Sequence, residues 1–521
     1  MRILYVDVDS LRPDHLGCYG YDRDTSPTVD RLAEEGRRFT NVYASDTPCL
    51  PSRTALFGGR FGIHTGLINH GGLNADPRPI GSERGFAHAS SFRSWIVVLN
   101  QAGYRTATVS PFPMRHGAWH MLAGFKELLD PGGNGRTRAD EVYPYAAEWL
   151  EENAAEDDWF LHVNFWDPHT EYDTPTEYGN PFADDPPPAW YTEDVLADHR
   201  QRYGPHSVRE PEGAGLGWNG TYDLPRMPAE IEDLDDYDQW VDGYDVGVRY
   251  MDDHLAKLLD VLEQEGVRQD TLVIFSADHG ENLGELNVFG DHQTADECTA
   301  NVPLVVSGPG VDQGVDEGLY YQLDLAPTVT ELVGEDVSER WDGRSFAGSL
   351  LADDDAVPGE NRSEYDGREF LVLSMGAWAC QRSVRWDDWL LIRTYHDGHK
   401  QILEDLMLFD LAEDPHETTN LATDRPDVVE EGVAMLQRWH DERMLDASLG
   451  RDGGNPDTPR GVTDPMWEVL REGGPYHARD RHLEPYADHL ESAGREDQAA
   501  ELRRRDGTPR PYDGQSGVRG D

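Results

Sequence analysis

Short apolar runs alternate with helical patterns through most of the chain, and this alternation limits the possible folds more than any other feature. Residues 3–9 read as a buried strand that ends in carboxylates. Ser26-Pro27 then opens a helix, with serine as the cap, proline in the first turn and Gly36 as the stop. The alternation predicts an α/β fold with a large, mostly parallel sheet covered by helices on both faces. Further strands are expected at 106–109, 159–165, 271–276 and 303–306, and a long helix at 244–265.

Composition divides the chain into parts. Residues 1–360 are expected to form the large domain, and residues 170–240 within it, rich in Pro, Gly, Asp and Tyr, an irregular insertion. In residues 361–447 short strands precede a helix, which predicts a small antiparallel α+β subdomain. Residues 448–521 are rich in Asp, Arg and Gly and are expected to form an acidic, polar peripheral tail.

Acidic side chains outnumber basic ones by 100 to 45, which gives the 521-residue chain a formal net charge of −55. We interpret this as a solvated acidic surface, and it argues against nucleic acid as a partner because phosphate binding needs a basic face. Salt relieves such self-repulsion, since the screening length falls to about 3 Å at about 1 M. The charge therefore predicts a salt-loving host, a hypothesis that equally good refolding without salt would contradict.

The expected location is the cytoplasm. No apolar run approaches the roughly 20 residues that a membrane-spanning helix needs, so no membrane partner is expected. The first residues enter a strand at once and lack the features of a secretory signal. The cysteines are too few for a disulfide framework and suit a reducing compartment. They are Cys18, Cys49, Cys298 and Cys380.

The strongest chemical signal is the run Cys49-Leu50-Pro51-Ser52-Arg53, which is followed by a predicted helix. Cys49 would lie at the helix N-terminus, where free N–H groups and the helix dipole favour an anion. Arg53, four residues later, falls on the same helical face and can steady that anion. A lone cysteine is more often a small buried side chain, but proline, serine and arginine at these offsets favour a functional site.

This run, with Gly59-Arg60 shortly after it, resembles the signature of the sulfatase family in the alkaline-phosphatase superfamily. The resemblance implies an alkaline-phosphatase-like catalytic domain that hydrolyses organic sulfate esters to inorganic sulfate and an alcohol. In that family a maturation enzyme oxidises the cysteine to formylglycine. One hydroxyl of the hydrated aldehyde attacks sulfur, and the other later expels sulfate. By resemblance, Cys49 is the modified nucleophile and Arg53 stabilises it.

Residues 6–20 are similar to the family's N-terminal motif, and this alignment makes Asp9, at a strand end, a metal ligand. Many members carry a second aspartate where this chain has Ser10. Either Ser10 supplies an oxygen or water takes that place.

Asp278-His279 follows a second apolar strand and resembles the other half of the family's metal site, which also includes Cys49 as formylglycine. Carboxylates that converge at strand ends need a cation or protons to coexist. Oxygen-rich sites suit calcium, magnesium or manganese rather than soft metals. The resemblance favours one calcium ion.

Two histidines are carried over from the resemblance as catalytic residues. Asp167-Pro168-His169 resembles a family segment in which His169 would contact sulfate or protonate the leaving oxygen, a role that suits a pKa near neutral. The segment 289–292 lies where relatives often carry Lys-His, but Asp291 replaces the lysine, so only His292 is carried over.

A larger departure follows the strand at 106–109. Many sulfatases have Gly-Lys-Trp-His there, whereas this chain has Ser-Pro-Phe-Pro at 110–113. The next basic residues are Arg115 and His116, and we hypothesise that they bind the substrate instead, although an ordinary surface pair fits equally well. Unchanged catalysis in Arg115→Ala would remove the assignment. Residues 408–421 resemble the family's C-terminal signature, so the resemblance covers about residues 1–445.

Two alternatives stay open. A phosphonate monoester or phosphodiester hydrolase of the same superfamily shares the fold and metal, because sulfate esters and phosphate diesters are both tetrahedral monoanions. A non-catalytic binding protein on a sulfatase scaffold would keep the core but lack maturation. The substrate is expected to be a small-molecule or saccharide sulfate ester. Aromatic residues of the insertion could stack on sugars or simply pack: Trp190, Tyr191, Trp218, Tyr222, Tyr237 and Trp240.

Overall fold

The computed structural model describes residues 1–78, 94–213, 224–351, 365–449 and 463–505, and two sheets organise them. The larger sheet has eight strands in the order β5-β4-β6-β1-β7-β8-β2-β9. These strands are β1 (Arg2–Val8), β2 (Arg37–Tyr43), β4 (Arg105–Val109), β5 (Glu127–Leu129), β6 (Trp159–Phe165), β7 (Thr271–Ala277), β8 (Asn301–Ser307) and β9 (Gly314–Tyr321).

The central strand β1 pairs in parallel with both β6 and β7, and β8 alone runs antiparallel to its two neighbours, β7 and β2. Val8 at the end of β1 lies beside Phe165 and Ala277, the last residues of β6 and β7. The residues that follow these three strands therefore emerge together at one edge of the sheet. The predicted mostly parallel α/β sheet is confirmed.

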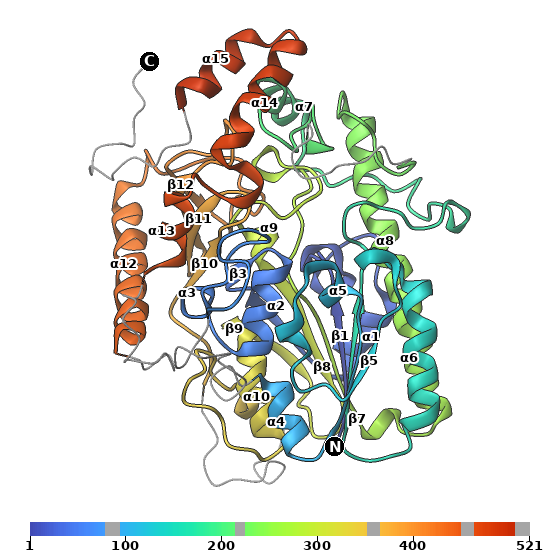
Figure 1. Cartoon of the computed structure of the whole chain (residues 1–521). Coiled ribbons are helices and arrows are strands. Elements are labelled where there is room, and N and C mark those ends of the chain that lie inside the picture. The colour runs from blue at the N-terminus through green and yellow to red at the C-terminus, as the bar shows by residue number, and fades with distance from the viewer. Residues whose placement is uncertain (79–93, 214–223, 352–364, 450–462, 506–521) are drawn as a thin grey trace.

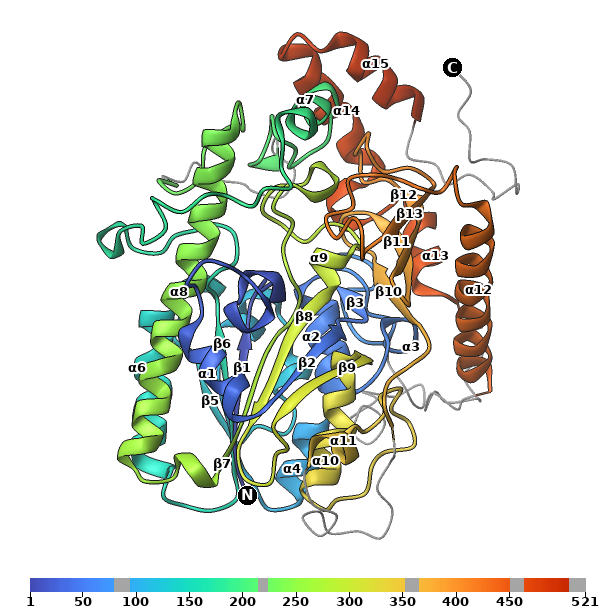
Figure 2. The ribbon, with the colours of Figure 1, turned by 180° about the vertical axis from the view of Figure 1, so that it is seen from behind.

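Helices cover both faces of this sheet (Figures 1 and 2). On one face α1 (Pro27–Glu35), α6 (Ala139–Asn153) and α8 (Leu234–Gln264) pack together. On the other face lie α2 (Cys49–Gly58), α4 (Trp95–Gln101) and α10 (Leu325–Leu332). The short helices are α3 (Gly62–Thr65), α5 (Phe112–His116), α9 (Glu297–Ala300) and α11 (Ala347–Leu350). Among the described residues, no helix has the length and apolar character that crossing a bilayer requires.

The smaller sheet has the order β13-β12-β11-β10-β3. Its strands are β3 (Asp46–Thr47), β10 (Leu371–Met375), β11 (Cys380–Trp386), β12 (Trp389–His396) and β13 (Leu406–Asp410). Strands β10–β13 are antiparallel, and α12 (Pro426–Ser448) packs on them through a second apolar core. β3 joins β10 in parallel. Because β3 ends two residues before Cys49, the smaller sheet is tied directly to the start of α2.

The insertion at 170–240 is irregular except for short helices such as α7 (Glu193–Gln201) and the first residues of α8. Its aromatic side chains pack inward. Tyr191 stacks on Tyr237 with ring centroids 4.1 Å apart, and Trp240 is fully buried against Phe289. Trp218 and Tyr222 lie outside the described residues. Of the two roles considered for Tyr191, Tyr237 and Trp240, packing within the insertion is therefore the one that the structure shows.

The C-terminal segment, of which residues 463–505 are described, packs more closely on the rest of the chain than the peripheral tail that its composition predicts. It builds α13 (Pro465–Arg471), α14 (Asp480–Ser492) and α15 (Glu496–Arg505), and the last two lie beside α7 in both views (Figures 1 and 2). A few apolar side chains, among them Met466 and Leu490, are fully buried. Such sparse apolar residues give little signal in a polar sequence, which is why composition misses the packing.

A buried ion pair holds the start of this C-terminal segment. Asp464 accepts hydrogen bonds from both terminal nitrogens of Arg382 on β11, at 2.7 and 2.8 Å, and from His440 on α12 at 2.9 Å. Burial works against the charged carboxylate, but the Arg382 guanidinium and these hydrogen bonds outweigh it and lower the pKa of Asp464 well below its ordinary value.

We predict that Asp464→Asn lowers the free energy of unfolding near pH 7 by about 3–5 kcal/mol, because it leaves Arg382 buried without a counter-charge. A depressed carboxyl pKa stabilises the fold above the unfolded pKa of about 3.9, and this gain is lost as pH falls below that value. Urea unfolding from pH 7 downward should therefore show the difference between wild type and variant shrinking below about pH 4. The control is Asp488→Asn, which removes an exposed carboxylate that pairs with Arg503 and should cost under about 1 kcal/mol. Equal losses in the two variants would contradict the prediction.

Candidate active site

The ends of three parallel strands and the start of one helix meet at a single buried point. Asp9 follows β1, Asp278 follows β7, and His169 lies in the turn after β6. Cys49 is the first residue of α2 and is 1% exposed. The sequence predicts these four residues at strand ends and a helix start, and the sheet register brings those ends together.

Two imidazoles lie against the sulfur of Cys49. The His279 Nε2 atom is 3.1 Å from Cys49 Sγ, and the His292 Nε2 atom is 3.5 Å from it. Burial, followed by the nearby carboxylates of Asp9 and Asp278, raises the pKa of the Cys49 thiol well above its ordinary value. A neutral thiol is a weak nucleophile, so the unmodified side chain is poorly suited to attack an ester.

Arg53 joins three carboxylates with one guanidinium. Its Nε donates to Asp7 Oδ2 at 2.8 Å, and its Nη1 donates to Asp9 Oδ2 at 3.0 Å and to Asp278 Oδ2 at 2.6 Å. The arginine was predicted to steady an anion near Cys49. In the structure its hydrogen bonds go to the carboxylates, which ties α2 to β1 and β7.

Asp7 is a member of this cluster that sequence reasoning missed. It lies two residues before Asp9, so both side chains leave β1 on the same face. It is fully buried, and His162 on the neighbouring β6 approaches its Oδ2 to 3.4 Å. A carboxylate inside an otherwise apolar strand, at the i−2 position from a predicted ligand, is the signal that could have identified it.

The residues predicted to hold a metal do come together. Asp9, Cys49, Asp278 and His279 each offer a ligand atom, and all four atoms lie within 4.8 Å of one another. Asp9 Oδ1 is buried and has no hydrogen-bond partner. Three buried carboxylates also face a single guanidinium, so the cluster lacks positive charge. A divalent cation fits both the free oxygen and the missing charge.

The electrostatics of the cluster point the same way. Burial and repulsion by Asp9 and Asp7 raise the pKa of Asp278 well above its ordinary value, although Arg53 opposes the shift. Burial lowers the pKa of His279 to about 4, so its imidazole is neutral and can act as a ligand. Ser10 leaves its Oγ without a partner and donates its backbone N–H to Asp278 Oδ1 at 3.2 Å. Both possibilities for Ser10, as a direct ligand or beside a water, remain compatible with this arrangement.

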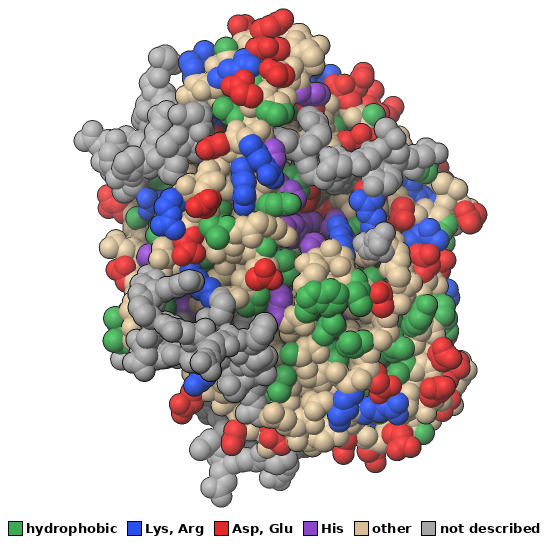
Figure 3. Space-filling view, in the orientation of Figure 1, with side chains coloured by type: hydrophobic (Ala, Val, Ile, Leu, Met, Phe, Trp, Pro, Cys, Tyr) green, Lys and Arg blue, Asp and Glu red, His purple; other side chains and the backbone are tan. Residues whose placement is uncertain are grey.

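A cavity of about 260 Å³ opens over Cys49. The predicted residues Arg115, His116, His169 and His292 all line it with Cys49. Figure 3 shows histidine side chains gathered in the hollow at the centre of this face, with basic side chains beside them. Arg115 lies over the ring of Trp166 with a 4.2 Å separation, so it is held inside the cavity and is not part of an ordinary surface pair.

Several further residues line the cavity that sequence reasoning did not name: His70, Arg136, Trp378, Tyr476 and His477. They come from loops and from the smaller sheet and C-terminal segment. No motif marks them, and only the tertiary fold brings them to Cys49.

His169 and His292 are held neutral. Burial, and then neighbouring basic or histidine side chains, lower the pKa of both residues well below the ordinary value.

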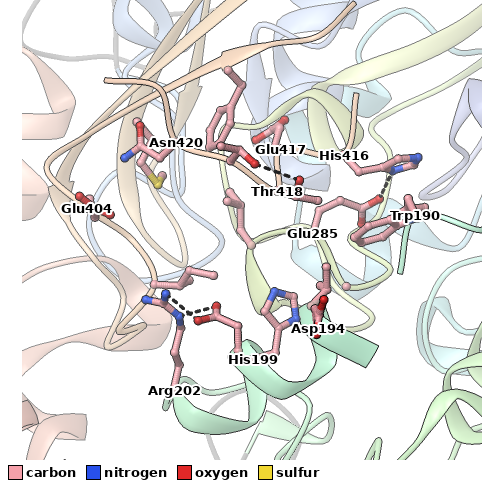
Figure 4. A pocket seen from close by; sticks show the side chains of 18 residues that line it. Trp190, Asp194, His199, Arg202, Glu285, Glu404, His416, Glu417, Thr418 and Asn420 are labelled. Carbon is pink, nitrogen blue, oxygen red and sulfur yellow. Dashed lines mark hydrogen bonds and ion pairs between the residues drawn. The ribbon is translucent and has the colours of Figure 1, made fainter. Parts of the chain in front are cut away.

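A second cavity of about 380 Å³ lies between α7 and the loop after β13 (Figure 4). Its wall includes Trp190, stacked on His416 with centroids 4.4 Å apart. Glu285 accepts from His416 at 3.0 Å and pairs with Arg12 at 2.9 Å. None of the predicted catalytic or metal-binding residues lines this second cavity.

Comparisons with known proteins agree with this geometry. The family model described as Sulfatase matches residues 2–335. The N-acetylglucosamine-6-O-sulfatase of Bacteroides thetaiotaomicron is 22% identical over 487 residues, covering 81% of this chain and 82% of the relative. A solved protein in complex with its substrate D-glucosamine-2-N,6-O-disulfate has a TM-score of 0.66 at 20% identity, covering 88% of this chain and 99% of that one. A phosphonate monoester hydrolase from Silicibacter pomeroyi has a TM-score of 0.62 at 21% identity, covering 85% and 95%.

The candidate cation site can be tested without an activity assay. Calcium added to chelator-treated protein should raise the melting temperature, because a ligand at 100 times its Kd stabilises by about 2.7 kcal/mol. Asp9→Asn should lose most of this shift, since it removes the negative charge of one of the converging ligands. Asp7→Asn is the matched control: Asp7 also bonds Arg53 but lies outside the ligand group, so its shift should persist. An undiminished calcium shift in Asp9→Asn would place the cation elsewhere.

Proposed function

Because the chain belongs to the sulfatase family, a family of sulfuric ester hydrolases, we propose that Cys49 is converted to formylglycine and acts as the nucleophile. A divalent cation, calcium with magnesium or manganese as alternatives, would be held by Asp9, Asp278, His279 and the converted Cys49. The observation that carries the proposal is the convergence of these four side chains on one buried point.

The modified side chain and the cation would make separate contributions. Hydrated formylglycine would supply one hydroxyl as the nucleophile toward sulfur, with the alcohol of the ester leaving, and a second hydroxyl through which sulfate is later expelled. The cation, when bound, offsets charge on the sulfate oxygens and favours the ionised nucleophile. Arg53 keeps Asp9 and Asp278 in place, and its Nη2 atom, which has no partner, is available to an oxygen at position 49.

The other cavity residues divide into two roles. His292, whose Nε2 is 3.5 Å from Cys49 Sγ, is placed to hold or accept a proton at the nucleophile. His169, with its ring centroid 5.1 Å from that of His292, would serve the leaving oxygen in its protonated form, which the negative charge of a bound sulfate ester favours over the neutral form. Arg115 and His116 would bind the sulfate oxygens, with Arg115 supplying the positive charge.

The substrate class follows from these residues. A monoanionic sulfate ester suits a site with one free arginine and neutral histidines, and relatives include enzymes named for sulfated amino sugars. A small-molecule or saccharide sulfate ester is therefore the proposed substrate. A formylglycine-generating enzyme is the implied maturation partner.

The proposal makes one prediction about Cys49 itself. In protein from a host that makes a maturase, the peptide containing Cys49 should have lost one sulfur and two hydrogens and gained one oxygen, by mass spectrometry. The same preparation should cleave an aryl sulfate, and chelator should remove the activity. Cys49→Ala is the control and should be inactive while folding normally. Full activity with an unconverted Cys49 would contradict the proposal.

A second prediction separates the two histidines. General acid catalysis matters most for a poor leaving group and typically contributes 10²–10⁴-fold, so His169→Ala should lower kcat/KM by about 10²-fold or more with an alkyl sulfate and far less with 4-nitrophenyl sulfate. His292→Ala should reduce both substrates alike, because it acts at the nucleophile. The opposite pattern would exchange the two roles.

A phosphonate monoester or phosphodiester hydrolase remains the alternative proposal. The similarity of this chain's fold to that of the Silicibacter pomeroyi enzyme supports it. Parallel kinetics with a sulfate monoester and a phosphate diester decide between them. A non-catalytic scaffold is disfavoured by the intact cluster, and the Cys49 peptide mass tests it directly.

A further inference from the structure

A row of aromatic rings leads from the nucleophile to the C-terminal segment. His292 touches Cys49, the ring of His70 lies 6.2 Å from that of His292, and the ring of His477 lies 5.7 Å from that of His70. His477 and its neighbour Tyr476 belong to a short 3-10 helix, Tyr476–Ala478, between α13 and α14. They therefore line the part of the cavity that lies beyond His292 and His70 from Cys49.

The C-terminal segment is fixed at both ends, so this part of the cavity is held in place. Asp464 is clamped by Arg382 at the start. Further on, Glu210 after α7 accepts from Tyr486 at 2.7 Å and from Arg495 at 2.5 Å. Helices α14 and α15 share a small apolar core with Tyr203.

Tyr476 and His477 are themselves tightly seated. The His477 ring stacks on Trp378 at 3.9 Å with planes 14° apart, and its backbone N–H donates to the carbonyl of Ala377 at 3.0 Å. Tyr476 lies directly on Gly71, where an added Cβ would come within 2.7 Å of its ring. Neither residue can swing away without breaking these contacts, so a larger ligand cannot simply displace them.

The remaining space is small. Pockets for drug-sized ligands run from roughly 300 to 1,000 Å³, and this cavity, with Tyr476 and His477 in its wall, is about 260 Å³. We propose that Tyr476 and His477 are specificity-determining residues that restrict the enzyme to sulfate esters of a small alcohol or a single ring. This inference rests on the proposed function, since it concerns the alcohol part of the same substrate.

The test compares two esters of the same leaving-group chemistry and different size. One is phenyl sulfate, and the other is biphenyl-4-yl sulfate, which carries a second aromatic ring on the phenol, on the side away from the sulfate. The wild type should favour the smaller ester by at least about tenfold in kcat/KM, because a rigid wall excludes the second ring. The double variant Tyr476→Ala/His477→Ala should reduce this preference about tenfold, through the larger ester.

Two further variants distinguish a loss of the size restriction from a general loss of structure or activity. Glu484→Ala removes an exposed side chain of the same segment that lies outside the cavity, so both esters should be cleaved as in wild type. Tyr476→Ala alone keeps the His477 stack and should show an intermediate preference. An unchanged preference in folded Tyr476→Ala and in the double variant would overturn the proposal.

Binding of unreactive sulfonates separates this inference from the proposed chemistry. Calorimetry with benzenesulfonate and biphenyl-4-sulfonate should give the wild type a Kd at least about tenfold lower for the smaller anion, and the double variant a reduced difference. If no sulfate ester is cleaved but the two sulfonates bind with these Kd differences, the proposed function is contradicted and the size restriction by Tyr476 and His477 is supported. If the wild type binds both sulfonates equally well, or binds neither, the proposed size restriction is contradicted whatever the enzyme's activity.

Discussion

The buried cluster of Arg53 with Asp7, Asp9 and Asp278 is the interaction on which the rest of the site depends. Burying a charge is costly unless it is paired and hydrogen-bonded, and breaking a buried pair typically costs about 3–5 kcal/mol. One guanidinium cannot neutralise three carboxylates. The fold therefore carries a deficit of positive charge at the point where the nucleophile lies, and a cation relieves it. Binding of the cation and the stability of this edge of the sheet are therefore coupled.

This cluster also fixes where Cys49 can be. Arg53 is four residues further along α2, so its bonds to β1 and β7 set the position and rotation of the helix. The preceding strand, β3, is held by β10 of the smaller sheet. The position of Cys49 is thus fixed by both sheets. Residues at the edge of the larger sheet bond to the helix that begins at Cys49, and the smaller sheet pairs with the strand that precedes it. A nucleophile placed this way needs no movement of its own loop to meet its neighbours.

The sequence was sufficient for the parts of the site that motifs mark. Apolar strands that end in aspartate predict both the sheet and the convergence of Asp9 and Asp278, because parallel strands expose their ends at one edge. Cys49 and Arg53 were recognisable from their spacing. His70, Trp378 and His477 were not, since each reaches the cavity through packing between segments far apart in the chain. The C-terminal segment was read as a tail because its helices bury only a few apolar residues, and the contacts that hold it are ion pairs whose partners the sequence does not reveal.

The distribution of charge favours binding of an anionic ester at the cavity over Cys49 and disfavours it elsewhere on the surface. A formal net charge of −55 repels an anionic ester over most of the surface. Around Cys49, however, the cavity is lined by Arg115, Arg136 and several histidines. Arg136 is paired with Glu171 at 2.8 Å, and the histidines are held neutral by burial, which leaves Arg115 as the cavity arginine whose charge can serve the substrate. Binding of a monoanion then depends on Arg115 and the bound cation together, and a dianion would lack a matching charge. Positive charge is scarce at this site. This scarcity requires a metal to hold the carboxylates, and it also favours esters that carry a single negative charge.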